Sequence, residues 1–249
     1  MLKKILSKLD NRLSRKPNYS PFLNLKSDHP FFSIYEKAVI LSDTPTSPGS
    51  RRSERFFNLI SFLDDTLKHI DGNVIEFGCW KGLSSYLISS TISNSKSDRL
   101  ITFEIVDSFE GLSSPTADDS LTKKTVDTLI KHHGSVQGAL SSSESHLFEL
   151  LSGYQFVNIH KGWIPDVLST LHTQSYCFAH IDVDLYQPTL SSIEYIYPLL
   201  TPGGVIICDD YNLMSWPGAS KAVDELQQRF GFSLITLSTG QGLIRKPLH

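Results

Sequence analysis

The chain has 249 residues, with 23 Lys and Arg against 26 Asp and Glu, which is a formal net charge of -3. This near-neutral balance argues against a nucleic-acid binder whose affinity rests on a basic surface. Hydrophobic residues make up 40% of the chain, so a wholly disordered chain is excluded, and only 3 cysteines exclude a disulfide-stapled secreted scaffold. The length permits one large α/β domain or two small ones, with a sizeable core.

The N-terminal segment has helical periodicity, with apolar residues on one face of residues 2–13 and basic residues over the rest. Charges interrupt the apolar stretch, so no signal peptide is predicted, and no run elsewhere is long and apolar enough to cross a bilayer. We favour a helix packed on the domain or on a partner subunit over one lying on an anionic membrane. The three thiols are expected to be buried and reduced, which favours the cytoplasm: Cys79, Cys177 and Cys208.

Repeated prolines predict that residues 17–55 are rich in loops. The later elements follow in chain order: a helix over 53–67, a strand over 74–78, a helix over 83–92, a strand over 100–106, a polar loop over 113–124, helices over 125–132 and 143–151, strands over 156–160 and 176–183, a helix over 189–197, a strand over 205–208, a helix over 220–230, and strands over 232–237 and 242–245. This alternation predicts a mostly parallel sheet with helices on both faces and an antiparallel last hairpin. We divide the chain into an N-terminal helical and loop extension, residues 1–52, and one domain, residues 53–249.

The stretch 74–82 is a strand, a glycine loop and the start of a helix, and it carries the first chemical signal. Gly78 lets the backbone turn at the end of the strand, and Gly82 permits a ligand to approach the next helix closely. The third glycine of the dinucleotide fingerprint is missing. Glu76 would repel a phosphate but hold an ammonium group, which fits the amino-acid half of S-adenosylmethionine better than NAD. The alternative is an ordinary turn and a solvated strand end.

An acidic residue at the end of the second strand is able to bind ribose hydroxyls in α/β nucleotide sites. Asp107 has this position, while Glu104 lies on the strand and competes for the role. The other interpretation of Asp107 is a solvated or helix-capping side chain.

Carboxylates also end the fourth and fifth strands, and they are the strongest signal. Asp182 should meet Asp209 and Asp210 at the carboxyl edge of the sheet, where a hard divalent cation such as Mg²⁺ would relieve their repulsion. The alternative is that some of these aspartates cap the following helices or pair with Lys or Arg, which is what we expect for Asp184. We expect His180 to be a core histidine that points away from Asp182.

Several short segments in this order together resemble the macrocin O-methyltransferase family, whose members methylate sugar hydroxyls on macrolides. They are residues 74–82, 107–112, 162–166, 181–186, 197–204 and 209–211. The resemblance covers about residues 54–246, and the run from Asp182 to Tyr211 is its most specific part. Residues between Leu112 and Phe156 have no match, which leaves the acceptor open.

The resemblance implies a class I methyltransferase fold, which is Rossmann-like, with a seven-stranded, mostly parallel sheet and an antiparallel last strand. It also implies S-adenosylmethionine as methyl donor and a Mg²⁺ site. The implied cofactor contacts are Glu76, Gly78 and Gly82 at the methionine part, Asp107 and Ser108 at the ribose, and Gly162 and Trp163 near the adenine. The implied metal ligands are Asp182, Asp209 and Asp210, with Asp182 also the catalytic base.

The function expected from these residues is transfer of a methyl group to a hydroxyl of a sugar or glycosylated small molecule. One alternative keeps the fold and takes a phenolic or catechol hydroxyl, with Trp163, Tyr211 and Trp216 as aromatic lining. Another is a non-catalytic binding module. We expect a homo-oligomer, with the N-terminal part as a candidate interface.

Overall fold

The computed structural model of the protein describes residues 21–44, 51–95 and 99–248, so the predicted helix over 2–13 lies outside the described residues. Its sheet has seven strands in the order β3-β2-β1-β4-β5-β7-β6. They are β1 (Asn73–Phe77), β2 (Phe103–Asp107), β3 (Val157–Lys161), β4 (Tyr176–Ile181), β5 (Leu200–Cys208), β6 (Ser233–Thr236) and β7 (Gly242–Arg245). The pairs from β3 to β5 are parallel, whereas β7 is antiparallel to β5 and to β6. The predicted fold class is therefore confirmed.

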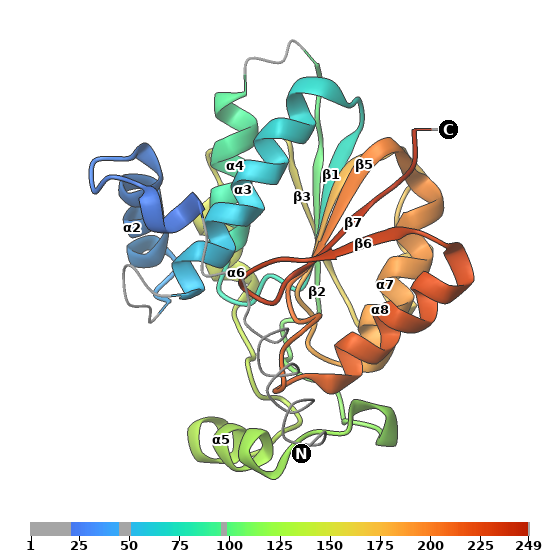
Figure 1. The fold of residues 1–249 in the computed structure, drawn as a ribbon. Helices are drawn as coiled ribbons and strands as arrows, with labels where there is room; N and C mark the ends of the chain where they lie inside the picture. Colours follow the sequence, from blue (N-terminus) through green and yellow to red (C-terminus); the bar gives the residue numbers. More distant parts are fainter. Residues whose placement is uncertain (1–20, 45–50, 96–98, 249) are drawn as a thin grey trace, which may run out of the picture.

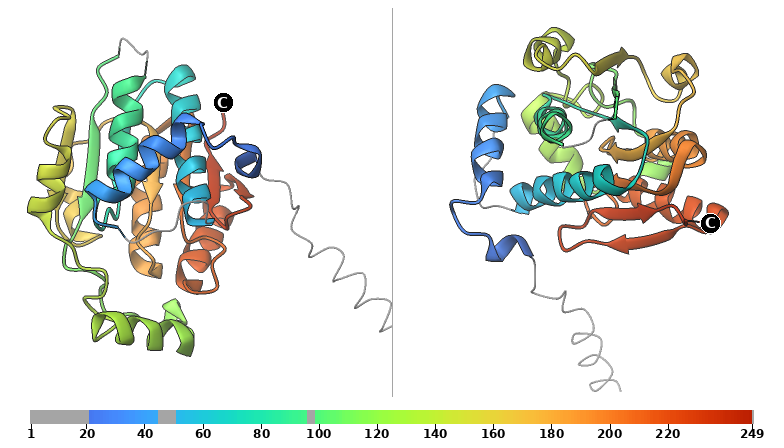
Figure 2. Two further views of the ribbon diagram at one scale, coloured as in Figure 1. Left: turned by 90° about the vertical axis from the view of Figure 1, so that its left-hand side faces the viewer. Right: turned by 90° about the horizontal axis from the view of Figure 1, so that it is seen from above.

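Helices cover both faces of the sheet (Figures 1 and 2). On one face lie α2 (Pro30–Leu41), α3 (Arg51–His69), α4 (Leu83–Asn94) and α6 (Glu144–Leu151), and on the other lie α7 (Tyr186–Leu199) and α8 (Pro217–Phe230). Alternate strand residues fill the two cores: Val74 packs in the core of the first face, and Ile75 in that of the second. Because side chains along a strand alternate in direction, each strand supplies both cores.

The helix α2 was not predicted, because residues 17–55 were interpreted as loop. Pro30 lies in its first turn, where a missing N–H costs nothing, so this proline starts the helix rather than breaking it. Phe31, Tyr35 and Ala38 follow at helical spacing and are buried in the core shared with α3 and α4. The division of the chain at residue 52 stays a prediction.

A segment beyond the carboxyl edge of the sheet joins β2 to α6 and carries η2 (Ala117–Asp119) and α5 (Lys123–His133) (Figure 1). It has its own small core, to which Leu112, Leu129 and Ala139 contribute with Leu185. Asp119 is buried, and its carboxylate accepts a hydrogen bond of 2.6 Å from the backbone N–H of Tyr186. This contact ties the segment to the start of α7, which begins three residues before its predicted start at residue 189.

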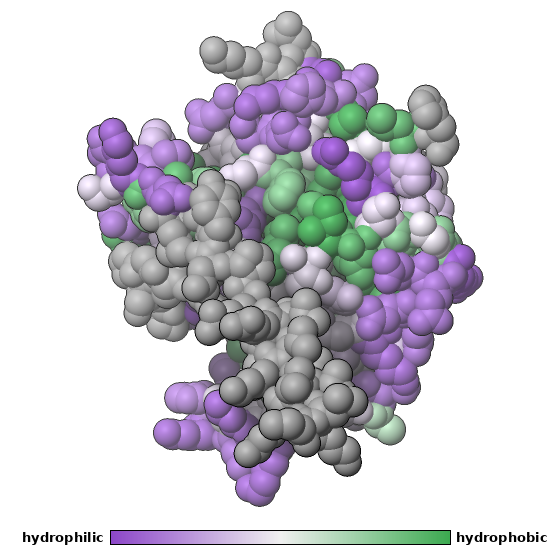
Figure 3. All heavy atoms as spheres, viewed as in Figure 1, coloured by the Kyte–Doolittle hydropathy of each residue, from purple (hydrophilic) through white to green (hydrophobic). Residues whose placement is uncertain are grey.

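Within the described residues, none of the helices combines the length and the apolar composition needed to span a membrane. Figure 3 shows apolar side chains gathered over β6 and β7, between helices with hydrophilic surfaces. Ile235 on the edge strand β6 is 57% exposed.

The turn after β1 depends on Gly78, which has a φ of +81°. A Cβ atom at this position would lie 2.1 Å from the backbone oxygen of Asp182, at the end of the neighbouring strand β4. Only a glycine therefore lets these two chain segments approach so closely.

We expect Gly78→Ala to lower the free energy of unfolding by at least about 3 kcal/mol, because left-handed backbone strain adds to a clash with rigid backbone. Urea unfolding measures the loss. Gly153→Ala is the matched control, since a Cβ there meets nothing within 4 Å. Equal losses for the two variants would contradict the account.

Candidate active site

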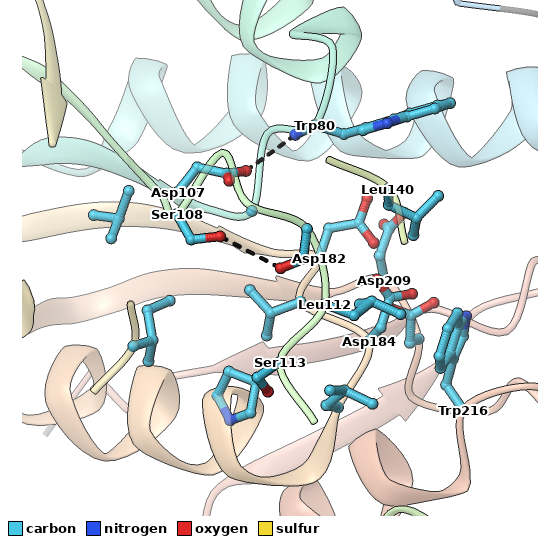
Figure 4. A pocket seen from close by; sticks show the side chains of 18 of the residues that line it. Trp80, Asp107, Ser108, Leu112, Ser113, Leu140, Asp182, Asp184, Asp209 and Trp216 are labelled. Atoms are coloured by element: carbon cyan, nitrogen blue, oxygen red, sulfur yellow. Dashed lines mark hydrogen bonds between the residues drawn. The ribbon is translucent and has the colours of Figure 1, made fainter. Parts of the chain in front are cut away.

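A pocket of about 330 Å³ opens at the carboxyl ends of β1, β2, β4 and β5. Figure 4 shows Asp107 and Ser108 toward one end of it, and Asp182, Asp184 and Asp209 toward the other, near Trp216. Ligands of open parallel sheets bind at this edge. The pocket is thus in the position expected for both a cofactor and an acceptor.

Asp107 holds the glycine loop in place. One of its carboxylate oxygens accepts hydrogen bonds from the backbone N–H groups of Cys79 at 2.7 Å and Trp80 at 3.1 Å. The other accepts from the N–H of Phe109 at 2.7 Å. A carboxylate offers about four lone-pair sites, so one remains for a ligand. The contact of Asp107 with a ribose stays a prediction.

The predicted cofactor residues fall into two groups. Those that line the pocket are Gly78, Asp107, Ser108, Gly162 and Trp163. Gly82 is not among the lining residues: it caps α4, and a Cβ there would lie 2.6 Å from the Leu147 side chain on α6. Its lack of a side chain therefore serves helix packing.

Glu76 also lies outside the pocket lining and is fully buried. One of its oxygens accepts a short hydrogen bond from the hydroxyl of Ser85 on α4, and the other lies 2.8 Å from Nδ1 of His180. Both oxygens are thus engaged inside the core. The predicted contact of Glu76 with an ammonium group has no support in this geometry.

The acidic residues after β4 and β5 lie close together as expected, but they form two overlapping groups of three residues. Asp182, Asp184 and Asp210 each offer a carboxylate oxygen within 4.8 Å of the others, and Asp182 meets His180 and Asp209 within the same limit. Oδ2 of Asp210 is buried and has no hydrogen-bond partner. Asp184 lines the pocket, and it does not cap α7: the N-cap residue is Leu185, and the N–H of Tyr186 donates to Asp119. The capping role expected for Asp184 is therefore wrong.

The charges of this cluster repel one another strongly. Burial first, and then the charge of Asp209, raise the pKa of Asp182 above its ordinary value. Burial and the charge of Asp210 raise the pKa of Asp184 further, and burial and Asp182 do the same for Asp210. Three carboxyls with raised pKa values in one pocket are a setting that a divalent cation stabilises.

Arg55 on α3 supplies positive charge to this cluster and was missed from the sequence. Its Nη2 lies 2.5 Å from Oδ2 of Asp209 and 3.6 Å from Oδ1 of Asp210. Gln241, immediately before the last strand, donates to Oδ1 of Asp209 at 2.6 Å. Asn58, one turn after Arg55, in turn donates to Gln241 at 3.2 Å. No motif pointed to these residues, because their partners lie far along the chain.

His180 is a core histidine as expected, but the direction predicted for its side chain is wrong. It shares a face with Asp182, because residues two apart on a strand point to the same side. Its Nε2 lies 3.3 Å from Oδ1 of Asp209. Burial alone would lower the pKa of His180, but the neighbouring carboxylates of Asp209 and Glu76 outweigh it and raise the pKa to about 10.

Glu104 belongs to a second hollow, outside the pocket lining. It accepts hydrogen bonds from Asn158 at 3.0 Å and Gln174 at 3.1 Å, and lies 2.6 Å from Nε2 of His160. Burial works against these contacts, which nonetheless lower the pKa of Glu104. Glu104 is therefore engaged elsewhere and does not compete with Asp107 for a ligand in the pocket.

Comparison with known proteins agrees with the fold and with the position of the pocket. Residues 43–233, well over half of the chain, match the family model described as Macrocin-O-methyltransferase (TylF). A Streptomyces olivaceus protein, 8-demethyl-8-(2,3-dimethoxy-alpha-L-rhamnosyl)-tetracenomycin-C 4'-O-methyltransferase, is 28% identical over 66% of this chain and 61% of its own length. Demethyldecarbamoylnovobiocin O-methyltransferase of Streptomyces niveus is 27% identical over 74% of this chain and 70% of its own. Among solved structures, the O-methyltransferase NovP has a TM-score of 0.65 at 24% identity, covering 78% of this chain and 80% of its own.

We expect Arg55→Met to lower the free energy of unfolding by about 3 kcal/mol at neutral pH, because breaking a buried ion pair leaves the carboxylates uncompensated. Burial alone raises the pKa of Asp209, but Arg55 and the hydrogen bonds of His180 and Gln241 bring it well below its ordinary value. A carboxyl with a lowered folded-state pKa adds stability above its unfolded pKa and loses it as the pH falls. The deficit should therefore be larger at about pH 7 than at about pH 2, which lies below the ordinary pKa of an aspartate.

Arg52→Met is the control for this variant. Arg52 lies on the same helix, lines the same pocket and has its guanidinium 5.6 Å from the centre of the Trp80 ring. Losing the contact with Trp80 should by itself cost no more than about 1 kcal/mol. If Arg52→Met loses as much stability as Arg55→Met, the ion pair of Arg55 with Asp209 is not the cause of the loss. The same holds if the stability deficit of Arg55→Met grows as the pH falls.

Proposed function

This chain belongs to the macrocin O-methyltransferase family, and from that membership we propose that it moves a methyl group from S-adenosylmethionine to a hydroxyl of a sugar or glycosylated small molecule. The observation that carries the proposal is one pocket that joins the glycine loop of β1 to the carboxylates after β4 and β5. The name of the Streptomyces olivaceus relative includes a rhamnosyl sugar, which supports a sugar-bearing acceptor. The match spans 61% of that relative's length.

The donor would lie across the ends of β1, β2 and β3. Gly78 leaves its backbone open to the methionine part, and Asp107 has one lone-pair site left for a ribose hydroxyl. Trp163 lines the pocket beyond β3 and would cover the adenine. Glu76, which was expected at the ammonium group, has no place in this proposal for the donor.

A hard divalent cation fits the acidic residues of the pocket. The unpartnered oxygen of Asp210 and the raised pKa values of Asp182 and Asp184 support this, because positive charge beside these carboxyls would favour their ionised forms. We assign Asp182, Asp209 and Asp210 as ligands, with Asp184 within reach. Oxygen donors of this kind suit Mg²⁺, which when bound would lower the pKa of an acceptor hydroxyl and orient it.

The transfer itself is an in-line displacement in which positioning dominates. The acceptor oxygen forms a bond to the methyl carbon as the carbon–sulfur bond breaks, and S-adenosylhomocysteine leaves with the electron pair. Asp182 takes the hydroxyl proton as general base. Asp184 is the second candidate for this role, because its carboxylate also lines the pocket and has a raised pKa.

We expect Asp182→Asn to lower kcat/KM at least about 100-fold, because it removes both a ligand and the base. Affinity for S-adenosylhomocysteine, measured by calorimetry, should stay unchanged. Asp127→Asn, at an exposed position on α5, is the control and should retain full activity. If Asp184→Asn loses turnover while binding Mn²⁺ normally, and Asp182→Asn keeps turnover, the base role moves to Asp184.

Removal of metal by a chelator should abolish turnover, and added Mg²⁺ should restore it, because a sugar hydroxyl is too weak an acid to react unaided. Turnover is measured by the release of S-adenosylhomocysteine. Full activity of protein shown by elemental analysis to be metal-free would overturn the metal assignment.

A phenolic or catechol acceptor is the second candidate, because aromatic side chains line the pocket: Phe56, Trp80, Trp163 and Trp216. Tyr211, which was expected among them, instead donates its hydroxyl hydrogen bond to Asp224 at 3.0 Å. Incubation with glycosylated acceptors and with their aglycones, read by mass spectrometry, separates the two classes. We expect methylation of the sugar-bearing member alone, and methylation of the aglycones alone would favour the phenolic acceptor. Failure to bind S-adenosylhomocysteine would favour a non-catalytic module.

A further inference from the structure

A buried polar chain runs behind the pocket, between the sheet and the layer of α3 and α4. Glu76 of β1 is the direct register partner of His180 of β4, and Asp209 follows the next strand, β5. The His180 ring lies between two carboxylates, with Nδ1 at 2.8 Å from Glu76 and Nε2 at 3.3 Å from Asp209. Glu76 and His180 are fully buried, and Asp209 is only 4% exposed.

Two of these three side chains do not line the pocket. Glu76 and His180 are absent from the pocket lining, whereas Asp209 is part of it. The effect of the pair on the pocket must therefore pass through the Asp209 carboxylate. That carboxylate is held from three sides, by His180 and Gln241 at Oδ1 and by Arg55 at Oδ2.

Apolar side chains would also fill this part of the core. Val74, Phe178 and Val205 occupy the same core at neighbouring strand positions, and all three are apolar. Replacing a buried ion pair by well-packed apolar side chains is often neutral or stabilising, so packing alone does not require Glu76 and His180. Residues that hydrogen-bond to ligating groups, in contrast, orient those groups and tune their affinity.

We infer that Glu76 and His180 are positioning residues that orient the Asp209 carboxylate toward the acidic cluster. This inference rests on the proposed function, since the orientation of Asp209 matters to the cluster only if a cation binds there. Glu76 then acts on the acidic end of the pocket and does not bind the ammonium group of the donor. Ser85 on α4 completes the chain by donating to the second oxygen of Glu76, which fixes the carboxylate before it meets His180.

Three variants test this inference: Glu76→Gln, His180→Gln, and Glu104→Gln as a matched control. Glu104 is a buried glutamate on the adjacent strand that also pairs with a histidine, but its partners do not touch the pocket. Mn²⁺ affinity is measured by electron paramagnetic resonance without acceptor, S-adenosylhomocysteine affinity by calorimetry, and stability by urea unfolding. All three properties are read on the full-length protein.

We expect Glu76→Gln and His180→Gln to weaken Mn²⁺ binding about 10-fold or more, the usual effect of removing such a partner of a ligand. S-adenosylhomocysteine affinity should stay within about twofold of wild type, since neither residue lines the pocket. Glu104→Gln should lose stability and keep both affinities. If Glu76→Gln unfolds, the double variant Glu76→Gln/His180→Gln retains an uncharged hydrogen-bonded pair and gives the same comparison.

Wild-type Mn²⁺ affinity in Glu76→Gln and His180→Gln would overturn the inference and leave the proposed function intact. Loss of S-adenosylhomocysteine affinity in Glu76→Gln with normal Mn²⁺ binding would return Glu76 to the cofactor. Equal weakening of Mn²⁺ binding in Glu104→Gln would reduce the role of the pair to general stability. A wild-type protein that binds no Mn²⁺ would sink the metal proposal itself, and this inference with it.

Discussion

Negative charge at the ends of β4 and β5 is the constraint on which the rest of this site depends. Asp182, Asp184, Asp209 and Asp210 lie so close together that burial and mutual repulsion oppose their ionisation. Asp209 alone is held as a carboxylate by the protein, chiefly through Arg55. The other three have raised pKa values, so positive charge beside them would favour their ionised forms.

The compensation comes from elements that are distant in the chain. Arg55 belongs to α3 on one face of the sheet, Gln241 immediately precedes the last strand, and His180 lies on the central strand β4. The α5 segment is attached to the opposite layer through Asp119, which accepts a hydrogen bond from the first turn of α7. The site is therefore held by both helical layers, and the sheet alone does not complete it.

Much of the pocket was predictable because carboxyl ends of parallel strands meet at one edge. Asp107, Asp182 and Asp209 each follow a short apolar strand, and the structure brings all three to the same pocket. The interpretation of Pro30 as a breaker was wrong, since a proline in the first turn suits a helix. The direction predicted for the His180 side chain was wrong, although its two-residue spacing from Asp182 already places both side chains on one face.

The sequence by itself determined the alternation of strands and helices, the turn at Gly78 and the edge of the sheet where the acids gather. These follow from local rules of periodicity, backbone freedom and strand direction. Only the tertiary structure decided that Glu76 turns inward to His180 and that Arg55 meets Asp209. Which buried charge finds which partner depends on the packing of elements far apart in the chain, because a buried charge is stable only where another group compensates it.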